Sequence, residues 1–258
     1  MRCLFNLLLA SAFVAQAQIP ALKTGREVVE AMHAHWQGRW YRTLAFSQHT
    51  RSLAPDGTET LGVWHEALEH PGRLRIDFSP LAGKSGLVCT PDRIHHFKGG
   101  SQTSVQETWN HLLVLIGDIY CQPGSRSLMQ LEKLGFDPAR THRAQWRGRT
   151  CFVVGAEAGD ERSNQFWIDA ETFLLWRVIR KDPDAPKAMR REVRIEEYRH
   201  VQGYPIAAKI HFLDEGRLFF SEDYFDIRVN PRLDPALFDP SCFASVPMPL
   251  GSSPDGKP

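Results

Sequence analysis

The connections between predicted strands in the second half of this chain are too short to contain helices. Runs of strand-forming residues cover positions 141–147, 150–157, 163–169, 173–181, 190–201, 204–213 and 217–229. Several are joined only by turns such as Arg147-Gly148-Arg149 and Gln202-Gly203. Parallel strands need a crossover of at least about a dozen residues, whereas antiparallel hairpins need only a turn. The second half therefore predicts an antiparallel sheet.

The first half adds further strands. Positions 41–53 and 59–69 flank the turn sequence Pro55-Asp56-Gly57, and positions 86–90 and 93–98 form another pair. Between these pairs, positions 73–78 alternate charged residues with Leu, Ile and Phe, which is typical of a strand with one buried and one wet face. The total is roughly eleven or twelve antiparallel strands.

Three amphipathic helices are predicted, one before the strands and two in the middle of the chain. Thr24 and Glu27 have the spacing of a capping box, and Val28, Val29 and Met32 follow on one helical face. Positions 109–120 and 127–134 also have helical apolar spacing, and they interrupt the series of strands. Each apolar stripe must cover another part of the molecule.

The size of the predicted sheet implies a hollow. An open twisted sheet of roughly this many strands tends to curl or split. Side chains alone fill the interior of a curled sheet only up to about eight strands. We therefore expect a mainly β protein with helices (α+β), built on a curved antiparallel sheet. Its interior is occupied either by the inserted helices or by a ligand.

Composition and charge exclude several classes of protein. The 258 residues carry a net charge of +1 without any basic block, which makes the chain a poor general nucleic-acid binder. The apolar fraction of 42% is too high for a disordered protein. Beyond the N-terminal segment, the longest apolar run covers only positions 112–116, far below the length of a transmembrane span.

The first seventeen residues have the layout of a secretory signal peptide. Arg2 precedes an apolar stretch at 4–14, and Ala15-Gln16-Ala17 provides small residues for cleavage. Cys3 lies before the apolar stretch, so lipid attachment to the exported chain is not expected. We expect a signal peptide at 1–17, a single domain at 18–243, a disordered Pro/Gly/Ser tail at 244–258, and a soluble exported protein.

Four cysteines remain after the signal peptide: Cys89, Cys121, Cys151 and Cys242. An even number in an oxidising compartment favours disulfides over metal binding. None has a neighbour at the spacing of a zinc site. Four cysteines allow three pairings, among which the sequence does not choose, and free buried thiols are the alternative.

No motif for catalysis, metal or cofactor binding survives a check of its spacing. His65 and His70 flank acidic residues as in a zinc-protease signature, but they lie five positions apart instead of four, and a strand places them on opposite faces. In carboxylate pairs such as Glu196-Glu197 and Glu222-Asp223, adjacent strand positions alternate in face, so one residue of each pair should face water, which fits ordinary solvated faces. We therefore expect a protein that is not an enzyme and uses neither a metal nor a cofactor.

The aromatic residues are more informative. All seven tryptophans lie on predicted elements, where they either pack in an ordinary core or line an apolar cavity with a few polar groups at its mouth. The residues that we expect to line such a cavity are Trp64, Ile76, Phe78, Phe166, Trp167 and Trp176. A shift of one residue in register would move each of these side chains to the other face of the sheet.

A characteristic order of motifs runs from about residue 22 to residue 240. The first helix and strand are followed by the turn His70-Pro71-Gly72, by Phe-Trp-Ile-Asp-Ala-Glu-Thr at 166–172, and by a last strand that ends in Asn-Pro-Arg-Leu-Asp-Pro-Ala-Leu-Phe at 230–238. In this order and spacing the chain resembles the LolA-like proteins, which are periplasmic carriers and sensors related to the lipoprotein-sorting chaperone.

The resemblance implies an incomplete β-barrel, a half-barrel in which the N-terminal helix and the two inserted helices act as plug or lid. It implies a periplasmic, non-catalytic carrier or binder of a lipid or lipoprotein acyl chain, serving transport to the outer membrane with a membrane-protein donor or acceptor. In the sorting chaperone an Arg precedes the proline of the third-strand turn and helps to control cargo release. His70 holds that position here. The resemblance therefore marks His70 as a gating residue and favours a relative with another lipid or partner over a true lipoprotein shuttle.

Two other functions fit the same sequence. A sensor or interaction module would use the concave face of the same fold to bind a protein partner. An unrecognised hydrolase would need a histidine clustered with a carboxylate or a serine inside the cavity, and His95, His96 and His111 are the residues to inspect.

Overall fold

The computed structural model describes residues 21–181 and 189–249. The predicted signal peptide at 1–17 lies outside the described residues. Within the described ranges no helix has both the length and the apolar character needed to cross a bilayer.

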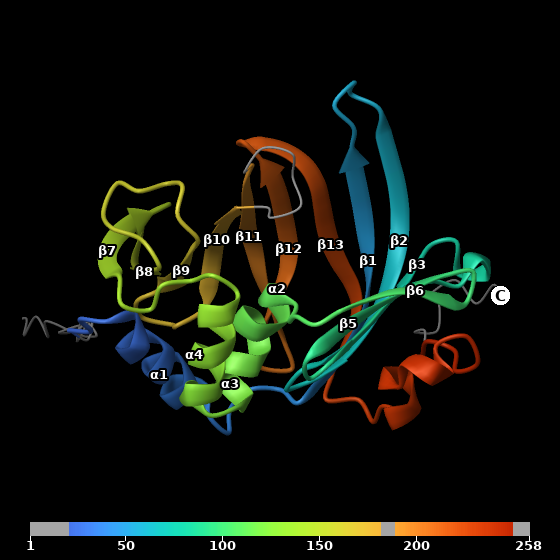
Figure 1. The fold of residues 1–258 in the computed structure, drawn as a ribbon. Helices are drawn as coiled ribbons and strands as arrows, with labels where there is room; N and C mark the ends of the chain where they lie inside the picture. The colour runs from blue at the N-terminus through green and yellow to red at the C-terminus, as the bar shows by residue number, and fades with distance from the viewer. Residues whose placement is uncertain (1–20, 182–188, 250–258) are drawn as a thin grey trace, which may run out of the picture.

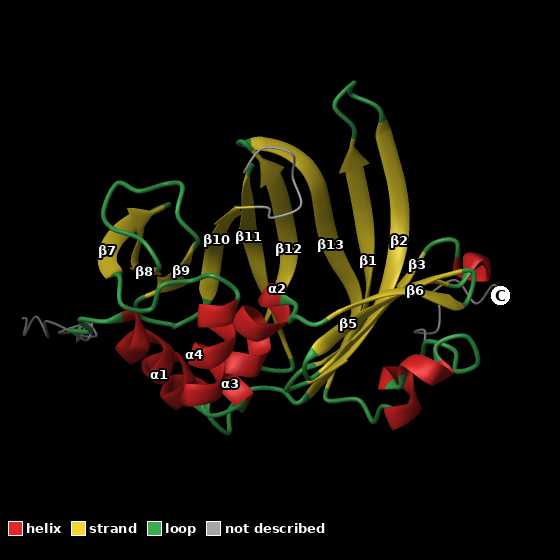
Figure 2. Cartoon of the chain, in the orientation of Figure 1, coloured by secondary structure: helices red, strands yellow, loops and turns green. Residues whose placement is uncertain are grey.

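A single antiparallel sheet of thirteen strands forms most of the molecule (Figure 1). Its strand order is β6-β5-β4-β3-β2-β1-β13-β12-β11-β10-β9-β8-β7. The sheet curves around the helices without closing, because its two edges, β6 and β7, do not pair with each other (Figure 2). The strands are β1 (Thr43–Leu53), β2 (Glu59–Glu69), β3 (Arg73–Phe78), β4 (Ser85–Thr90), β5 (Arg93–Lys98), β6 (Ser101–Gln106), β7 (Thr141–Trp146), β8 (Arg149–Val154), β9 (Gln165–Asp169), β10 (Leu175–Lys181), β11 (Arg190–Val201), β12 (Tyr204–Asp214) and β13 (Arg217–Val229).

This arrangement confirms the predicted curved antiparallel sheet. Every pair of neighbours is consecutive in sequence except β1 and β13, whose pairing joins the first half of the chain to the second. Strand β6 was not predicted. All six of its residues are exposed and almost all are polar, so it has no apolar alternation to detect.

Helices occupy the concave side of the sheet (Figure 1). The predicted helix at 109–120 consists of α2 (His111–Leu113), a π-helical turn, η2 (Val114–Asp118), and α3 (Ile119–Cys121). The second inserted helix is α4 (Gly124–Lys133). Short 3₁₀ turns complete the chain: η1 (Leu81–Gly83), η3 (Pro235–Phe238) and η4 (Pro240–Cys242).

The N-terminal helix α1 (Gly25–Trp36) begins with the predicted capping box. The Thr24 hydroxyl accepts a hydrogen bond from the Glu27 amide at 3.2 Å, and the Glu27 carboxylate accepts one from the Thr24 amide at 3.1 Å. Val28, Val29 and Met32 are completely buried, so the predicted apolar face is the one that packs on the core.

The outer face of β3 is covered at Arg75, whereas Arg73 at the start of the strand is exposed, so the expectation of a wet face holds only in part. Arg75 is only 2% exposed, because the C-terminal segment covers it. Its guanidinium donates to Asp77 at 2.7 and 2.9 Å and to the Phe243 carbonyl at 3.0 Å, and it lies 4.6 Å from the centre of the Phe243 ring. Phe243 also stacks on Phe97 of β5 at 4.1 Å. Arg75, held by Asp77, thus anchors a covering segment instead of facing water.

The covering segment continues past the predicted end of the domain. Met248 is buried in a small apolar cluster with Ala67, Leu237 and Phe238. Within the predicted tail, Met248 and the partly buried Val246 therefore pack in this cluster, while residues 244, 245 and 247 are exposed. The remainder of the predicted tail, 250–258, lies outside the described residues.

The preference for disulfides is wrong for this fold. Cys89, Cys121, Cys151 and Cys242 are all free thiols. Cys89 belongs to the main core, and Cys151 to a separate cluster with Val153 and Trp167. The four cysteines lie on β4, α3, β8 and η4, so the fold distributes them over different elements.

The capping box gives a direct test of this end of the fold. Thr24→Ala should lower the free energy of unfolding by about 1 kcal/mol, because the Glu27 amide loses its acceptor. Urea unfolding followed by circular dichroism measures the change. Ser125→Ala, which removes an exposed hydroxyl from α4, is the matched control and should have little effect. Equal midpoints for the two variants would contradict the role of the cap.

Candidate functional site

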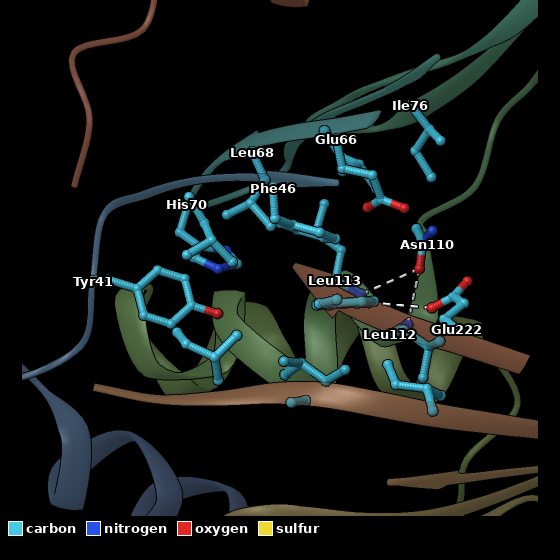
Figure 3. Close-up of a pocket in the computed structure, with 17 residues that line it drawn as sticks. Tyr41, Phe46, Glu66, Leu68, His70, Ile76, Asn110, Leu112, Leu113 and Glu222 are labelled. Carbon is cyan, nitrogen blue, oxygen red and sulfur yellow. Dashed lines mark hydrogen bonds between the residues drawn. The ribbon is translucent and has the colours of Figure 1, made fainter. Parts of the chain in front are cut away.

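An apolar cavity of about 100 Å³ lies between the concave face of the sheet and the helices (Figure 3). The strands β1, β2, β3, β12 and β13 form its walls, and the segment from Asn110 through α2 to Ile116 covers it. We call residues 110–121 the lid. The lining residues are Tyr41, Leu44, Phe46, Glu66, Leu68, His70, Leu74, Ile76, Asn110, Leu112, Leu113, Ile116, Ile206, Ala207, Ile210, Glu222 and Tyr224.

The alternation of strand side chains explains how the walls form. Leu44 and Phe46 lie two positions apart on β1, and Leu74 and Ile76 lie two positions apart on β3, so each pair points to one face. In the lid, Ile116 follows Leu112 and Leu113 of α2 by four and three residues, a helical spacing that places all three on the face toward the cavity. Sheet and lid therefore present their apolar sides to each other.

Two carboxyl groups project into this apolar space. Glu66 on β2 is 6% exposed and Glu222 on β13 is 9% exposed. Burial raises the pKa of Glu66 well above its ordinary value of 4.5, and the nearby carboxyl of Glu222 raises it further. Burial also raises the pKa of Glu222 to about 7, although hydrogen bonds with Tyr224 and Gln48 oppose the shift. At neutral pH the folded protein therefore holds protons on this pair.

Two aromatic rings lie beside the carboxyl pair. Phe46 and Tyr224 stack with their ring centres 4.1 Å apart, and both line the cavity. Phe46 is the register partner of Glu66 on the neighbouring strand, and the Tyr224 hydroxyl donates to Glu222 at 3.2 Å. One end of the cavity thus combines two acids with two aromatic faces.

The lid is fastened to the sheet by a buried histidine. His70 Nδ1 lies 2.8 Å from Asp118 Oδ1, and both side chains are about 1% exposed. The same Asp118 oxygen accepts a hydrogen bond from the Gly72 amide at 2.9 Å. The His70 ring also packs against Gly117, where a Cβ would meet it at 1.9 Å. The turn between β2 and β3 therefore holds the π-helical turn closely.

An aromatic cluster continues the concave face away from the lid. Trp64 contacts Phe78 at 4.3 Å and Phe220 at 5.2 Å, and Phe220 contacts Phe212 at 5.4 Å between ring centres. All four rings are only partly buried. Trp64 lies two positions before Glu66 on β2, so the cluster shares the face that forms the cavity.

The six residues that the sequence assigns to the cavity lining lie in different parts of the structure. Ile76 lines the cavity, and Trp64 and Phe78 lie in the adjoining aromatic cluster. Phe166 is fully buried in the main core against Phe136. Trp167 points to the opposite face and packs with Cys151, because neighbouring residues on a strand cannot share a face. Trp176 packs against Tyr198, with Arg149 3.9 Å from the centre of its ring.

His70, the predicted gating residue, both lines the cavity and contacts the lid. Sequence reasoning missed Glu66 and Glu222. The expectation that one residue of the Glu222-Asp223 pair faces water agrees with Asp223, whose partly exposed side chain pairs with Arg199 at 2.7 Å, but it does not reveal that Glu222 lines the cavity. The alternation of side chains along a strand offered a signal for Glu66: it is two positions from both Trp64 and Leu68, so it shares their apolar face.

His95 and His111, two of the residues to inspect for a hydrolase, are not clustered with a carboxylate or a serine inside the cavity in the described part of the chain. His95 contacts Gln102 at 2.8 Å on the β5–β6 edge. Burial, with Arg180 and Arg191 nearby, lowers the pKa of His111 to about 3, so this ring stays neutral. Ser47 and His65 lie 2.8 Å apart, on the face away from the cavity, and Ser47 is only 5% exposed. Within residues 21–181 and 189–249, no group of three or more His, Cys, Asp or Glu could hold a metal.

No family model and no curated protein matches the amino-acid sequence. The fold, in contrast, has clear neighbours among solved structures. A LolA superfamily protein from Nitrosomonas europaea is 12% identical, with a TM-score of 0.55 over 84% of this chain and 98% of its own. A DUF1329 family protein from Desulfovibrio piger is 12% identical, with a TM-score of 0.57 over 85% and 97%.

A domain from Vibrio parahaemolyticus, described as an outer membrane lipoprotein-sorting protein, is 10% identical, with a TM-score of 0.53 over 85% of this chain and 98% of its own. These three likenesses confirm that the chain has a LolA-like fold. They agree with the resemblance that the sequence motifs indicated.

The carboxyl pair makes a prediction about stability and pH. Glu66 and Glu222 bind protons more tightly in the folded than in the unfolded chain, so their contribution is full below their ordinary pKa of 4.5 and is lost as the pH rises through about 7. From about pH 5 to about pH 8, the free energy of unfolding should fall by about 3 kcal/mol more in the wild type than in the Glu66→Gln/Glu222→Gln double variant. Urea unfolding at both pH values measures the difference.

Asp223→Asn is the matched control, because it removes a carboxyl from the neighbouring position on the other face of β13. This variant should keep the pH dependence of the wild type. Parallel curves for the wild type and the double variant would show that the two buried carboxyls titrate normally.

Proposed function

We propose that this protein is a non-catalytic carrier or binder of a hydrophobic ligand, the acyl chain of a lipid or lipoprotein. The observation that carries the proposal is the apolar cavity between the curved sheet and the lid. The LolA-like fold supports it, since one structural neighbour is described as an outer membrane lipoprotein-sorting protein. With the predicted signal peptide, the proposal places the protein in the periplasm, where it would receive its ligand from a membrane donor or deliver it to an acceptor.

The physical basis of the proposed function is burial. Each acyl methylene taken out of water is worth roughly 0.8 kcal/mol, so a chain of about fifteen methylenes needs an apolar lining worth about 12 kcal/mol to leave a membrane. The cavity and the adjoining aromatic cluster together offer such a lining along the concave face. No chemical step is needed, only an exchange of one apolar environment for another.

The size of the cavity implies that the lid moves. The cavity of about 100 Å³ is smaller than the roughly 150 Å³ pocket that holds one benzene molecule in a protein core. A long acyl chain therefore does not fit while the lid is in this position. Displacing the lid from β1, β2 and β13 would open a continuous apolar path from the cavity to the aromatic cluster around Trp64.

The contact between His70 and Asp118 is the proposed latch of this lid. It is the buried polar link between the β2–β3 turn and the π-helical turn, and it involves the residue that the family resemblance marks for gating. A π-helical turn within a helix is frequently found at functional sites. In this proposal, breaking the latch frees the lid to move and exposes the acyl-binding face.

The test of the proposed function is direct detection and blocking of binding. Organic extracts of the purified protein should contain acyl lipids by mass spectrometry, and the delipidated protein should bind the neutral apolar dye Nile red. Ala207→Leu, which adds bulk inside the cavity, should lower the affinity for Nile red at least about tenfold. Ala54→Leu makes the same change at the exposed β1–β2 turn and should bind normally.

A protein that yields no lipid and binds no dye would contradict the carrier. In that case the sensor or interaction module, which uses the same concave face for a protein partner, becomes the better assignment.

The latch predicts the rate of ligand exchange. Asp118→Ala leaves His70 and the Gly72 amide without their shared acceptor, which costs about 1–3 kcal/mol in the closed state. Release of Nile red should accelerate about tenfold, and amide hydrogen exchange across residues 111–121 should increase. Asp118→Asn keeps an acceptor oxygen and should restore most of the slow release. A folded Asp118→Ala variant with unchanged release would exclude a latch at this position.

A further inference from the structure

The cavity has a strong asymmetry of charge. Its lining includes the carboxyl groups of Glu66 and Glu222 but no lysine or arginine. The other polar side chains of the lining are Tyr41, His70, Asn110 and Tyr224. Figure 3 shows Glu66, Asn110 and Glu222 together at one end of the cavity, with His70 and Tyr41 at the other. A ligand with a negatively charged head would therefore meet two acids at this end and no cation.

Glu66 lacks the partner that a buried acid normally has. Its side chain is 94% buried, and Figure 3 shows it directed into the cavity. The causes of its raised pKa are burial and the nearby carboxyl of Glu222, and no hydrogen bond is among them. Buried polar groups are hydrogen-bonded in the large majority of cases, and a buried carboxyl without a donor is costly. A donor supplied by a ligand would remove this cost.

The aromatic pair beside the acids favours the same kind of ligand. Phe46 is opposite Glu66 in the strand register, and Tyr224 lies two positions after Glu222 on β13. The faces of such rings attract cations, and the attraction increases when the cation is desolvated. Because the two rings stack on each other at 4.1 Å, each has only its outer face and its edge left for other contacts. Carboxyl groups beside this aromatic pair, with no basic side chain in the cavity lining, form an environment complementary to an ammonium group.

We propose that the cavity binds an amphiphile with an ammonium head, which places its nitrogen between Glu66 and Glu222 and its alkyl chain along Leu44, Leu68 and Ile206. This inference rests on the proposed carrier function and names the chemical class of its ligand. It excludes the anionic head groups that a cavity lined by lysine or arginine would favour.

Binding of such a ligand exchanges protons for the ammonium ion. The titratable groups nearest the pair are Tyr224 on β13 and Cys89 on β4, together with the uncharged Gln48 and Asn110, while Tyr41 and His70 lie at the other end of the cavity. None of these is a permanent cation. The carboxyls, which hold protons in the ligand-free fold, release them to solvent when the ammonium arrives, so affinity rises with pH until both are ionised.

The experiment compares three amphiphiles with the same decyl chain: decylammonium, decanoate and the neutral decyl glucoside. Isothermal titration calorimetry below the micelle concentration of each measures their affinity for the delipidated protein at about pH 7.5. Decylammonium should bind at least about tenfold more tightly than decanoate. The Glu66→Gln/Glu222→Gln double variant should lose this preference while binding decyl glucoside as the wild type does. Asp223→Asn, with its change on the outer face, should keep the preference.

The outcomes separate this inference from the carrier function. Equal affinity for the three probes, or a preference for decanoate, in the wild type would overturn the ammonium site and leave the carrier in place. Failure of all three to bind would overturn both. A preference that survives in the double variant would place the ammonium elsewhere and also overturn the assignment to Glu66 and Glu222. Repeating the titration in two buffers of different ionisation enthalpy should detect proton release on decylammonium binding.

Discussion

The pairing of β1 with β13 is the constraint on which the rest of the structure depends. Without this ladder the chain would form two separate stacks of hairpins, because every other strand pairs only with its neighbour in sequence. The Asn230 side chain reinforces the junction by accepting a hydrogen bond from the Arg42 amide at 2.8 Å. The junction also sets the two acids on the strands either side of β1, so that Glu66 and Glu222 face the same enclosed space.

Much of the fold could be predicted from the sequence, because it is determined by local signals. Short connections fixed the antiparallel pairing, and Thr24 with Glu27 fixed the start of the first helix. The prediction failed where distant segments determine the environment. The burial of Arg75 on β3 depends on Phe243, some 168 residues further along the chain, and no local pattern encodes that contact. The prediction also missed the edge strand β6. This strand buries no side chain, so its sequence has no apolar pattern that would mark it as a strand.

The candidate site was less predictable than the fold. The predicted lining residues are mostly large aromatic side chains, but size does not determine which face of a strand a side chain occupies. Successive residues of a strand point to opposite faces, so the adjacent Phe166 and Trp167 cannot both line one cavity. The residue type alone does not indicate whether an acidic side chain is buried or solvated. Glu222 and Asp223 are adjacent acids on opposite faces of β13, and which of them faces inward is set by a register that includes irregularities in the pairing of β13 with both of its neighbours.

The C-terminal segment that covers β3, β4 and β5 supports this part of the sheet more firmly than the helical side of the molecule is supported. Arg75 ties its own strand to that segment through a carbonyl and an aromatic ring, and Phe97 stacks on the same ring from β5. This wing of the sheet is thus a sandwich, with packing on both sides that resists bending. Opening of the interior is therefore expected on the helical side, where the polar contacts of Asp118 with His70 and with the Gly72 amide hold a π-helical turn against the sheet.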